Sequence, residues 1–315
     1  MMVFVRIAGI SVRFGPLFPG GERPRAVTIA ARNPILSSTS GAVMKLTVGI
    51  LIVSFGLQSL HADENTQPEK KEVVTGRIWM RSYDFKEAEK KMEYGLYVPR
   101  DYDANKSYPL MVALHGLHSN PRQILGYPGF TKLAQEHGYI LAAPMGYNTK
   151  GWYGGRGQTS RRWNPENLGE LSEKDVMNVL KIVRAEFNVD SKRIYLMGHS
   201  MGGGGTWHIG IKYPDIWAGL APVAPATFRS PGDLSKIRTT PVILVQGDKD
   251  RLVSVRGARR WASKMKELGM THKYIEVKDG NHVAPAITQL PAIFEFFAKH
   301  AKEVPSGSKE PAANE

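Results

Sequence analysis

The stretch that decides the fold is Arg193–Gly205, which reads RIYLMGHSMGGGG. An apolar run typical of a buried strand leads into the five-residue turn GHSMG at 198–202, and a helical pattern follows. Gly-x-Ser-x-Gly between a strand and a helix indicates a tight turn that lifts a serine hydroxyl above a sheet, with glycines where side chains would collide. The pattern alone is common by chance, but here its context agrees with it. We therefore predict that Ser200 is a nucleophile.

Strands and helices alternate on both sides of this turn. The expected strands are Tyr94–Val98, Pro109–His115, Tyr139–Met145, Arg193–Gly198, Ala218–Val223, Pro241–Gln246 and Lys273–Val277. The expected helices are one that opens at Ser172 with Asp175 as its capping partner, Met201–Lys212, Ser254–Leu268 and Ala286–Ala301. This alternation predicts an α/β fold with a mainly parallel central sheet and helices on both faces. In such sheets the chemistry lies at the carboxyl ends of the strands.

A serine hydroxyl needs a base within hydrogen-bond reach, and a third group must orient that base. His272, His282 and His300 are the candidates in the C-terminal part of the chain. His272 comes directly before an expected strand and His300 near the end of an expected helix, where an ordinary surface histidine is the simpler interpretation. His282 lies in the loop after the last strand, from which an imidazole could reach the turn. We expect His282 to be the base.

Two aspartates compete for the role of the orienting acid in the segment QGDKDRLV at 246–253. Either could simply form a turn, as Asp beside Gly often does. The segment resembles the H-G-x-x-D-x-x-V loop of many hydrolases, and this alignment favours Asp250 over Asp248. The chain order Ser200, Asp250, His282 is the order found in α/β-hydrolases.

Acyl transfer also needs two N–H donors for the oxygen that becomes negatively charged in the tetrahedral intermediate. The N–H of Met201 follows the nucleophile at the start of a helix, where the helix dipole favours an anion. The second donor is expected from the segment HGLH at 115–118, with Leu117 the favoured residue. We interpret His115 and His118 as residues that shape this loop.

Cofactor chemistry has little support in the sequence. The glycine run at 202–205 could be misread as a phosphate-binding loop, but no Gly-Lys-Ser/Thr follows it, so close packing of the helix start is the better interpretation. The chain has no cysteine, and no cluster of His, Asp and Glu has metal-ligand spacing. We expect no metal and no other cofactor.

At these residues the sequence resembles the α/β-hydrolase superfamily. In particular it is similar to secreted bacterial esterases grouped with polyhydroxybutyrate depolymerases, feruloyl esterases and the catalytic domain of prolyl oligopeptidases. The resemblance covers about residues 75–300 and is carried by Tyr94–Asp103, Tyr108–Asn120, Arg193–Tyr213 and the loops of Asp250 and His282. Gln246 departs from the frequent His before Gly247, which weakens the assignment of the acid.

The resemblance implies a serine hydrolase that cleaves carboxylic esters, small or polymeric, through an acyl-enzyme. A prolyl oligopeptidase-like peptidase is the alternative, although the sequence has no propeller or cap domain to select peptides. A non-catalytic binding protein on the same fold is a third hypothesis, which the complete set of Ser200, Asp250 and His282 disfavours.

The longest irregular stretch before the turn at Ser200 is 146–171, and it is the candidate for a substrate pocket. Only 50 positions separate Ser200 from Asp250 and 32 separate Asp250 from His282, which leaves no room for a large cap after the turn. We expect the aromatic and arginine side chains of the stretch to recognise an aromatic, glycan-linked or carboxylate-bearing substrate. The chosen residues are Trp152, Tyr153, Arg161 and Trp163. The alternative is a solvated loop with anchoring tryptophans.

The first 62 residues are expected to lie outside the catalytic domain. Residues 44–62 have a basic residue, an apolar run at 46–57 and a small residue, Ala62, at the cleavage point, as in a signal peptide. The run is too short to span a bilayer, although a buried helix or an uncleaved anchor is an alternative. We interpret residues 1–43 as an extension that is not translated, with translation starting at Met44. The alternative is an arginine-rich targeting arm.

This organisation predicts a single catalytic domain at 63–302 and a disordered tail at 303–315. The protein should be secreted or periplasmic, without stable membrane insertion after cleavage. The formal charge of +13 includes six basic residues and one acidic residue within 1–62, so the rest of the chain carries +8. Its charges are mixed, without a basic tract, and we expect no nucleic-acid partner.

Overall fold

The computed structural model describes residues 4–7, 10–13, 73–157 and 165–302. The chain divides into two units, Met1–Thr66 and Gln67–Glu315. In the first, strand β1 (Phe4–Ile7) pairs antiparallel with β2 (Ile10–Arg13). Apart from these two strands, the predicted extension and the predicted signal peptide lie outside the described residues, as does the predicted tail at 303–315.

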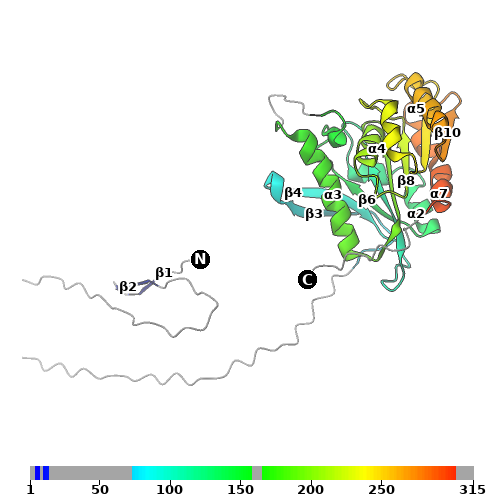
Figure 1. Ribbon diagram of the computed structural model, residues 1–315. Helices are drawn as coiled ribbons and strands as arrows, with labels where there is room; N and C mark the ends of the chain where they lie inside the picture. The colour runs from blue at the N-terminus through cyan, green and yellow to red at the C-terminus, as the bar shows by residue number, and fades with distance from the viewer. Residues whose placement is uncertain (1–3, 8–9, 14–72, 158–164, 303–315) are drawn as a thin grey trace, which may run out of the picture. The chain divides into compact units, whose positions relative to one another are not determined.

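The second unit is built on one eight-stranded sheet in the order β10-β9-β8-β7-β5-β6-β4-β3 (Figure 1). Its strands are β3 (Trp79–Phe85), β4 (Lys90–Tyr97), β5 (Tyr108–Leu114), β6 (Ile140–Pro144), β7 (Val189–His199), β8 (Gly219–Val223), β9 (Val242–Gly247) and β10 (His272–Val277). The strands from β10 to β6 run parallel, and only β4 and β3 are antiparallel to their neighbours. The mainly parallel sheet predicted from the sequence is thus confirmed.

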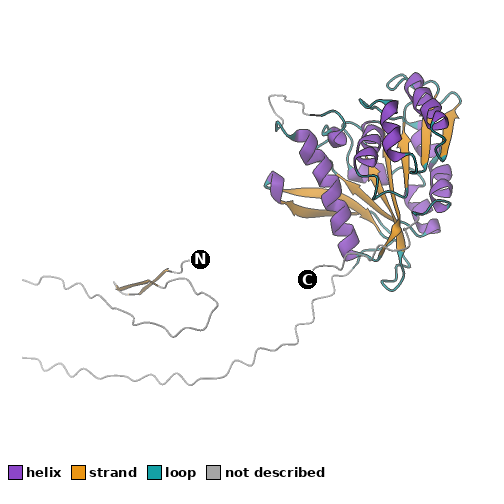
Figure 2. Ribbon diagram, viewed as in Figure 1, coloured by secondary structure: helices purple, strands orange, loops and turns teal. Residues whose placement is uncertain are grey.

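The central strands are buried along their whole length because helices cover both faces of the sheet (Figure 2). One face carries α3 (Leu168–Glu186), α4 (Met201–Lys212) and α5 (Val255–Glu267). The other carries α1 (Pro121–Leu125), α2 (Phe130–His137), α6 (Ala284–Thr288) and α7 (Leu290–Ala298). Successive residues of β5 alternate between the two apolar cores, as the two-residue period of a strand requires. In the described ranges, no helix is long and apolar enough to cross a membrane.

Two predicted helix boundaries are wrong. Helix α3 begins at Leu168, so Ser172 and Asp175 lie inside it and form no cap. The Ser172 hydroxyl donates to the Gly146 carbonyl at 2.7 Å, and Asp175 accepts from the Tyr83 hydroxyl at 2.6 Å. These polar residues therefore hold tertiary contacts, which resemble a capping pair only in their spacing.

The predicted C-terminal helix 286–301 is instead the pair α6 and α7. Each of the two helices has a proline in its first turn, Pro285 and Pro291, where a proline costs no intrahelical hydrogen bond. Pro291 interrupts the helical ladder after Thr288 and makes Gln289 the junction.

The parallel strands bring six loops to one edge of the sheet. The segments that follow β5, β6, β7, β8, β9 and β10 all leave from the carboxyl ends of neighbouring strands. This edge holds Ser200, Asp250 and His282, although they are far apart in the chain.

Candidate active site

Ser200 occupies a sharp turn between β7 and α4 with φ 57° and ψ −115°, a conformation that side chains rarely adopt. Hydrogen bonds fix it, because its N–H donates to the Val223 carbonyl at 2.9 Å and its carbonyl accepts from the Ala226 N–H at 3.0 Å. A Cβ on Gly202 would collide with the carbonyl oxygen of Leu114. The glycine requirement of the motif is therefore steric, and the strain is held in place by the core.

Asp250 and His282 form a close pair, with His282 Nδ1 2.7 Å from Asp250 Oδ2. The Asp250 side chain is fully buried, and its Oδ1 accepts from the N–H groups of Leu252 at 2.8 Å and Val253 at 2.9 Å. Burial by itself would raise the pKa of Asp250, but the bonds from Val253, His282 and Leu252 outweigh it and lower the pKa. The carboxylate is thus held ionised beside the imidazole.

The competing residues from the sequence do not reach this pair. Asp248 forms no hydrogen bond to His282, and its buried Oδ1 has no partner in the described part of the chain. His272 Nδ1 lies 2.8 Å from the Met270 carbonyl, and His300 Nδ1 lies 2.7 Å from the Phe296 carbonyl. The structure therefore pairs His282 with Asp250 and leaves the other two histidines in local backbone contacts.

Ser200 and His282 line the same pocket, which has a volume of about 470 Å³. No hydrogen bond joins the two side chains among the described residues. In structures without substrate this contact is often long and shortens when substrate binds. The Ser200 hydroxyl and the His282 imidazole thus face the same pocket, and Asp250 holds the imidazole in its orientation.

The two expected oxyanion donors border this pocket. Met201 is the first residue of α4, so its N–H has no acceptor within the helix. Leu117 lines the pocket, and its N–H forms no backbone hydrogen bond within the described ranges. The neighbouring Gly116 packs against Ser200. Both N–H groups are therefore available to a ligand.

His115 and His118 shape the loop that carries Leu117. The ring nitrogens of His115 lie 2.8 Å from the Gly116 carbonyl and 2.9 Å from the Met145 carbonyl, and burial lowers the pKa of this histidine. His118 has a positive φ of 63°, and its N–H donates to the Thr149 carbonyl at 2.9 Å. Both residues thus fix the backbone in which the Leu117 N–H is presented.

His199, the residue before Ser200, links the turn to the His282 loop and was not singled out from the sequence. Its buried ring has Nε2 2.9 Å from the His282 carbonyl and Nδ1 2.8 Å from the Tyr127 hydroxyl. Burial lowers the pKa of His199 to about 4, with a smaller contribution from the charge of His282. The ring is therefore neutral, with Nε2–H donating to the carbonyl and Nδ1 accepting from the tyrosine.

Gln246 supports the acid from below. Its side chain is fully buried, and Nε2 donates to Asp250 Oδ2 at 2.9 Å and to the Val253 carbonyl at 3.1 Å. The sequence did carry a signal here, since Gln246 replaces a frequent histidine. The substitution keeps a donor aimed at Asp250, so the departure from the pattern leaves the Asp250–His282 pair intact.

The residues predicted to bind substrate have different positions. Trp152 lines the pocket, with its ring centroid 5.2 Å from that of Phe228. Tyr153 is fully buried beneath it, where its hydroxyl donates to the His115 carbonyl at 3.3 Å, so it does not reach the pocket wall. Arg161 and Trp163 lie outside the described residues.

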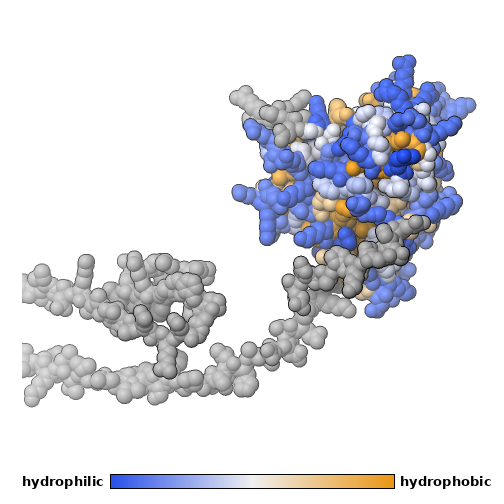
Figure 3. Space-filling view, viewed as in Figure 1, coloured by the Kyte–Doolittle hydropathy of each residue, from blue (hydrophilic) through white to orange (hydrophobic). Residues whose placement is uncertain are grey.

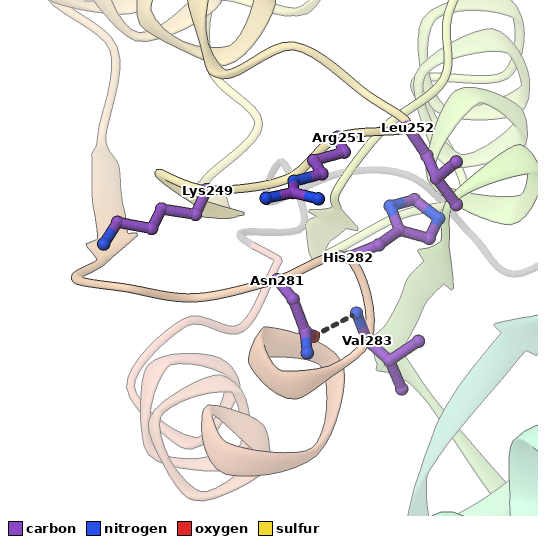
Figure 4. A pocket seen from close by; sticks show the side chains of 6 residues that line it. All are labelled: Lys249, Arg251, Leu252, Asn281, His282 and Val283. Carbon is purple, nitrogen blue, oxygen red and sulfur yellow. Dashed lines mark hydrogen bonds between the residues drawn. The ribbon is translucent and has the colours of Figure 1, made fainter.

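The mouth of the site is apolar and basic, which the sequence reasoning missed. Leu252 is 78% exposed and Val283 is 46% exposed, and both line the pocket of Ser200. Figure 4 shows Leu252 beside the imidazole of His282, with Arg251 nearby and Lys249 extending away from it. Large apolar side chains this exposed and this close to a reactive group indicate a surface that binds a ligand.

No group of three or more His, Asp or Glu residues that could hold a metal ion is found in the ranges that the structure describes. The chemistry available at this edge of the sheet is that of a hydroxyl, an imidazole, a buried carboxylate and two free N–H groups. This set can carry out acyl transfer.

Comparison with known proteins gives the same class of chemistry. The model of the Esterase family matches residues 86–297. A bifunctional acetylxylan esterase/xylanase of Neocallimastix patriciarum is 26% identical over 160 residues, 50% of this chain and 21% of that protein. The S-formylglutathione hydrolase of Bos taurus is 29% identical over 155 residues, 45% of this chain and 55% of that protein. The chain therefore spans under two thirds of the length of either relative.

Solved structures share the fold. A ferulic acid esterase from Anaeromyces mucronatus, solved in complex with ferulic acid, has a TM-score of 0.59 at 20% identity and covers 73% of this chain and 92% of its own. An S-formylglutathione hydrolase from Agrobacterium tumefaciens has a TM-score of 0.57 at 17% identity, with 73% and 98% covered. At these identities the likeness establishes an α/β-hydrolase fold.

Proposed function

The chain belongs to the Esterase family, and from this premise we propose that it is a serine carboxylic-ester hydrolase that cleaves its esters through an acyl-enzyme formed on Ser200. The observation that carries the proposal is the 2.7 Å contact between His282 Nδ1 and the buried Asp250 carboxylate, in the same pocket as the strained Ser200. A buried carboxylate that orients an imidazole in the same pocket as a serine hydroxyl is the arrangement that activates a serine nucleophile.

In the proposed reaction, Ser200 Oγ attacks the ester carbonyl carbon while His282 Nε2 takes the hydroxyl proton. The tetrahedral intermediate collapses, the carbon–oxygen bond to the alcohol breaks, and the alcohol leaves with the proton from His282. A water molecule then attacks the acyl-enzyme with His282 again as base. The acid leaves, and Ser200 regains its proton. Asp250 keeps the imidazole in the tautomer that can accept at Nε2 and stabilises its protonated form.

The charge on the intermediate would be stabilised by the N–H groups of Leu117 and Met201. Each donor of this kind is worth about 2.7–4 kcal/mol of transition-state energy. The start of helix α4 adds a favourable dipole at the Met201 side. Because both N–H groups belong to rigid backbone, they need no rearrangement when charge develops.

The test uses the full-length chain with 4-nitrophenyl butyrate and a fluorophosphonate that labels active serines. We expect ester turnover and a single covalent adduct, mapped by mass spectrometry to Ser200. An adduct on another residue, or turnover without labelling, would contradict the assignment of the nucleophile. Ser200→Ala is the matched control, because it removes one oxygen atom.

A serine peptidase with the same machinery is the alternative reaction. The proposal favours esters because the Esterase family model matches the chain, and two relatives are named as an acetylxylan esterase/xylanase and an S-formylglutathione hydrolase. The same preparation should therefore be assayed with aminoacyl anilides. Amide turnover that exceeds ester turnover would replace the ester proposal with the peptidase one.

We further propose that the enzyme is exported, to the periplasm or the medium. The support is the sequence pattern at 44–62, a basic residue followed by an apolar run and a small residue. Expression with a C-terminal tag, fractionation and N-terminal sequencing should give a mature chain that begins at Asp63. Recovery of uncleaved chain from the cytoplasm would contradict it.

A further inference from the structure

A second groove, of about 500 Å³, adjoins the pocket of Ser200. The segment 225–231 forms one side of it and helix α5 forms the other. The two spaces share the wall residues Ala226, Leu252 and Val253. A ligand in the groove can therefore extend directly to the reactive serine.

The groove contains three arginines and no acid. Arg229, Arg256 and Arg260 line it, and none of its lining residues is Asp or Glu. The pocket of Ser200 and the opening around His282 also have no Asp or Glu among their lining residues. Lys249 and Arg251 line the opening around His282. No Asp or Glu therefore lines any of the three spaces, although Arg229 and Lys249 have carboxylate partners just outside them, Asp233 and Asp279.

The arginines differ in what already binds them. Arg229 is tied to Asp233 at 3.3 Å and to His208 Nδ1 at 3.1 Å. The exposed side chains of Arg256 and Arg260 form no hydrogen bond or salt bridge within the described ranges. Arg259, on the same helix, is held by Glu276 through two bonds of 2.9 and 2.5 Å. Arg256 and Arg260 are therefore the cations available to a ligand, and Arg259 is their matched counterpart.

The same openings collect the exposed apolar side chains. Among the described residues, the large hydrophobic side chains that are exposed are Leu117, Phe228, Leu252 and Val283, and each lines one of these spaces. On the face seen in Figure 3, hydrophilic residues predominate and hydrophobic ones form small patches. Phe228, 62% exposed, lies in the arginine groove itself. The ligand should therefore have an apolar body as well as an anionic group.

We propose that the groove of Arg256 and Arg260 binds the anionic end of an amphipathic ester, which places the scissile carbonyl at Ser200. A guanidinium matches a carboxylate, phosphate or sulfate through paired N–H donors. Phe228 and Leu252 contact the apolar part of the same molecule. The inference rests on the proposed function of Ser200 and adds the substrate class to it.

The test compares esters that differ only in charge. Mono-4-nitrophenyl adipate and suberate are matched with 4-nitrophenyl hexanoate and octanoate, which have the same acyl lengths without the carboxylate. A second pair, 3-carboxyphenyl and 3-carbamoylphenyl butyrate, puts the charge on the alcohol side. We expect a higher kcat/KM for the anionic member of at least one pair, and an advantage that shrinks as salt is raised, since exposed charges are screened.

The variant Arg256→Gln/Arg260→Gln should lower kcat/KM for the preferred anionic ester about three- to tenfold, as expected for one or two exposed ionic contacts. Its kcat/KM for the neutral ester should stay within twofold of wild type. Arg259→Gln is the control on the same helix, and it should leave the ratio of anionic to neutral turnover unchanged. All three residues are exposed, so folding should be preserved in both variants.

The outcomes separate this inference from the proposed function. No turnover of the neutral esters by wild-type protein would count against the acyl-enzyme proposal. Turnover of neutral esters with no anionic advantage, or an advantage that survives in the Arg256→Gln/Arg260→Gln variant, would overturn the groove proposal alone. An equal loss in Arg259→Gln would show a general effect of net charge and would also overturn it.

Discussion

The floor and the rim of the site are built in opposite ways. The floor, formed by His199, Ser200, Gln246 and Asp250, is largely enclosed, and its groups are fixed by hydrogen bonds from neighbouring strands and loops. The rim, formed by Phe228, Leu252, Arg256 and Arg260, is exposed and has few fixed partners. The side chains that carry out the reaction are thus held in fixed positions by hydrogen bonds. The side chains that contact the substrate at the rim are exposed and free to adapt to it. Changes in the floor should therefore affect all esters alike, and changes in the rim should affect some esters more than others.

The largest effect is expected for the nucleophile. Ser200→Ala should lower kcat by about 10⁵ to 10⁶ for every ester, because the acyl-enzyme can no longer form. The kcat values for anionic and neutral esters should fall by the same factor, because both need the acyl-enzyme. Activity is measured with purified variant in stopped and continuous assays, and urea unfolding checks that the fold is kept. Residual activity within a hundredfold of wild type would place the nucleophile elsewhere.

The second effect distinguishes two neighbouring carboxylates. Asp250→Asn should lower kcat by about 10⁴, because the amide would leave His282 in the wrong tautomer. Asp248→Asn is the matched control, and it should change kcat less than about tenfold, because Asp248 does not contact His282. The two variants are compared with the same ester panel. A larger fall in kcat for Asp248→Asn than for Asp250→Asn would make Asp248 the residue that orients His282. A fall in kcat of Asp250→Asn for only one ester would contradict the expectation that floor residues affect all esters alike.

Much of the floor could be predicted from the sequence because its elements are buried on both faces. Continuous apolar runs mark β5 and β9 to within one or two residues, and the turn at Ser200 has a motif that sterics impose. The half-exposed edge strand β3 and the short helices α1 and α2 were missed, since they have neither a continuous apolar run nor several turns of periodicity. The local sequence pattern therefore predicts fully buried strands well, and it predicts edge strands and short helices poorly.

The supporting contact of His199 could not be predicted, because it joins residues distant in the chain. His199 reaches the His282 carbonyl only because β7 and the loop after β10 end at the same edge of the sheet. Tyr153 was expected in the pocket from its aromatic character, yet it is fully buried in the core, where its hydroxyl donates to the His115 carbonyl. The rim was missed for a related reason, since exposed Leu252 and Arg256 look like ordinary surface residues in a sequence.

The third effect is on stability and concerns the buried ring of His199. The pKa of His199 is about 4 in the folded protein and about 6.5 when unfolded, so between these values the unfolded chain binds more protons. Its contribution to stability is therefore fully present above about pH 6.5 and is lost as the pH falls towards 4. The loss approaches roughly 1.4 kcal/mol per pH unit.

The comparison with His199→Gln isolates this contribution, since glutamine keeps an N–H donor but does not titrate. Urea unfolding of both proteins from about pH 7 to 4 gives the difference in free energy at each pH. Asp175, whose pKa burial raises to about 6, changes stability in the opposite direction over part of this range, but it is present in both proteins and cancels. The advantage of wild type over the variant should shrink as the pH falls. A constant difference would mean that His199 is not held neutral.

The smallest effect is expected at the rim, where Leu252→Ala removes the most exposed large apolar side chain among the described residues. A side chain that is 78% exposed contributes little to folding, so the free energy of unfolding should change by less than about 0.5 kcal/mol. An apolar acyl chain that packs on Leu252 would lose part of about 1–2 kcal/mol of burial. We therefore expect kcat/KM to fall about two- to fivefold for 4-nitrophenyl octanoate and to stay nearly unchanged for the acetate. An equal fall for both esters would show that Leu252 supports the neighbouring His282 instead, and would move it from the rim to the floor.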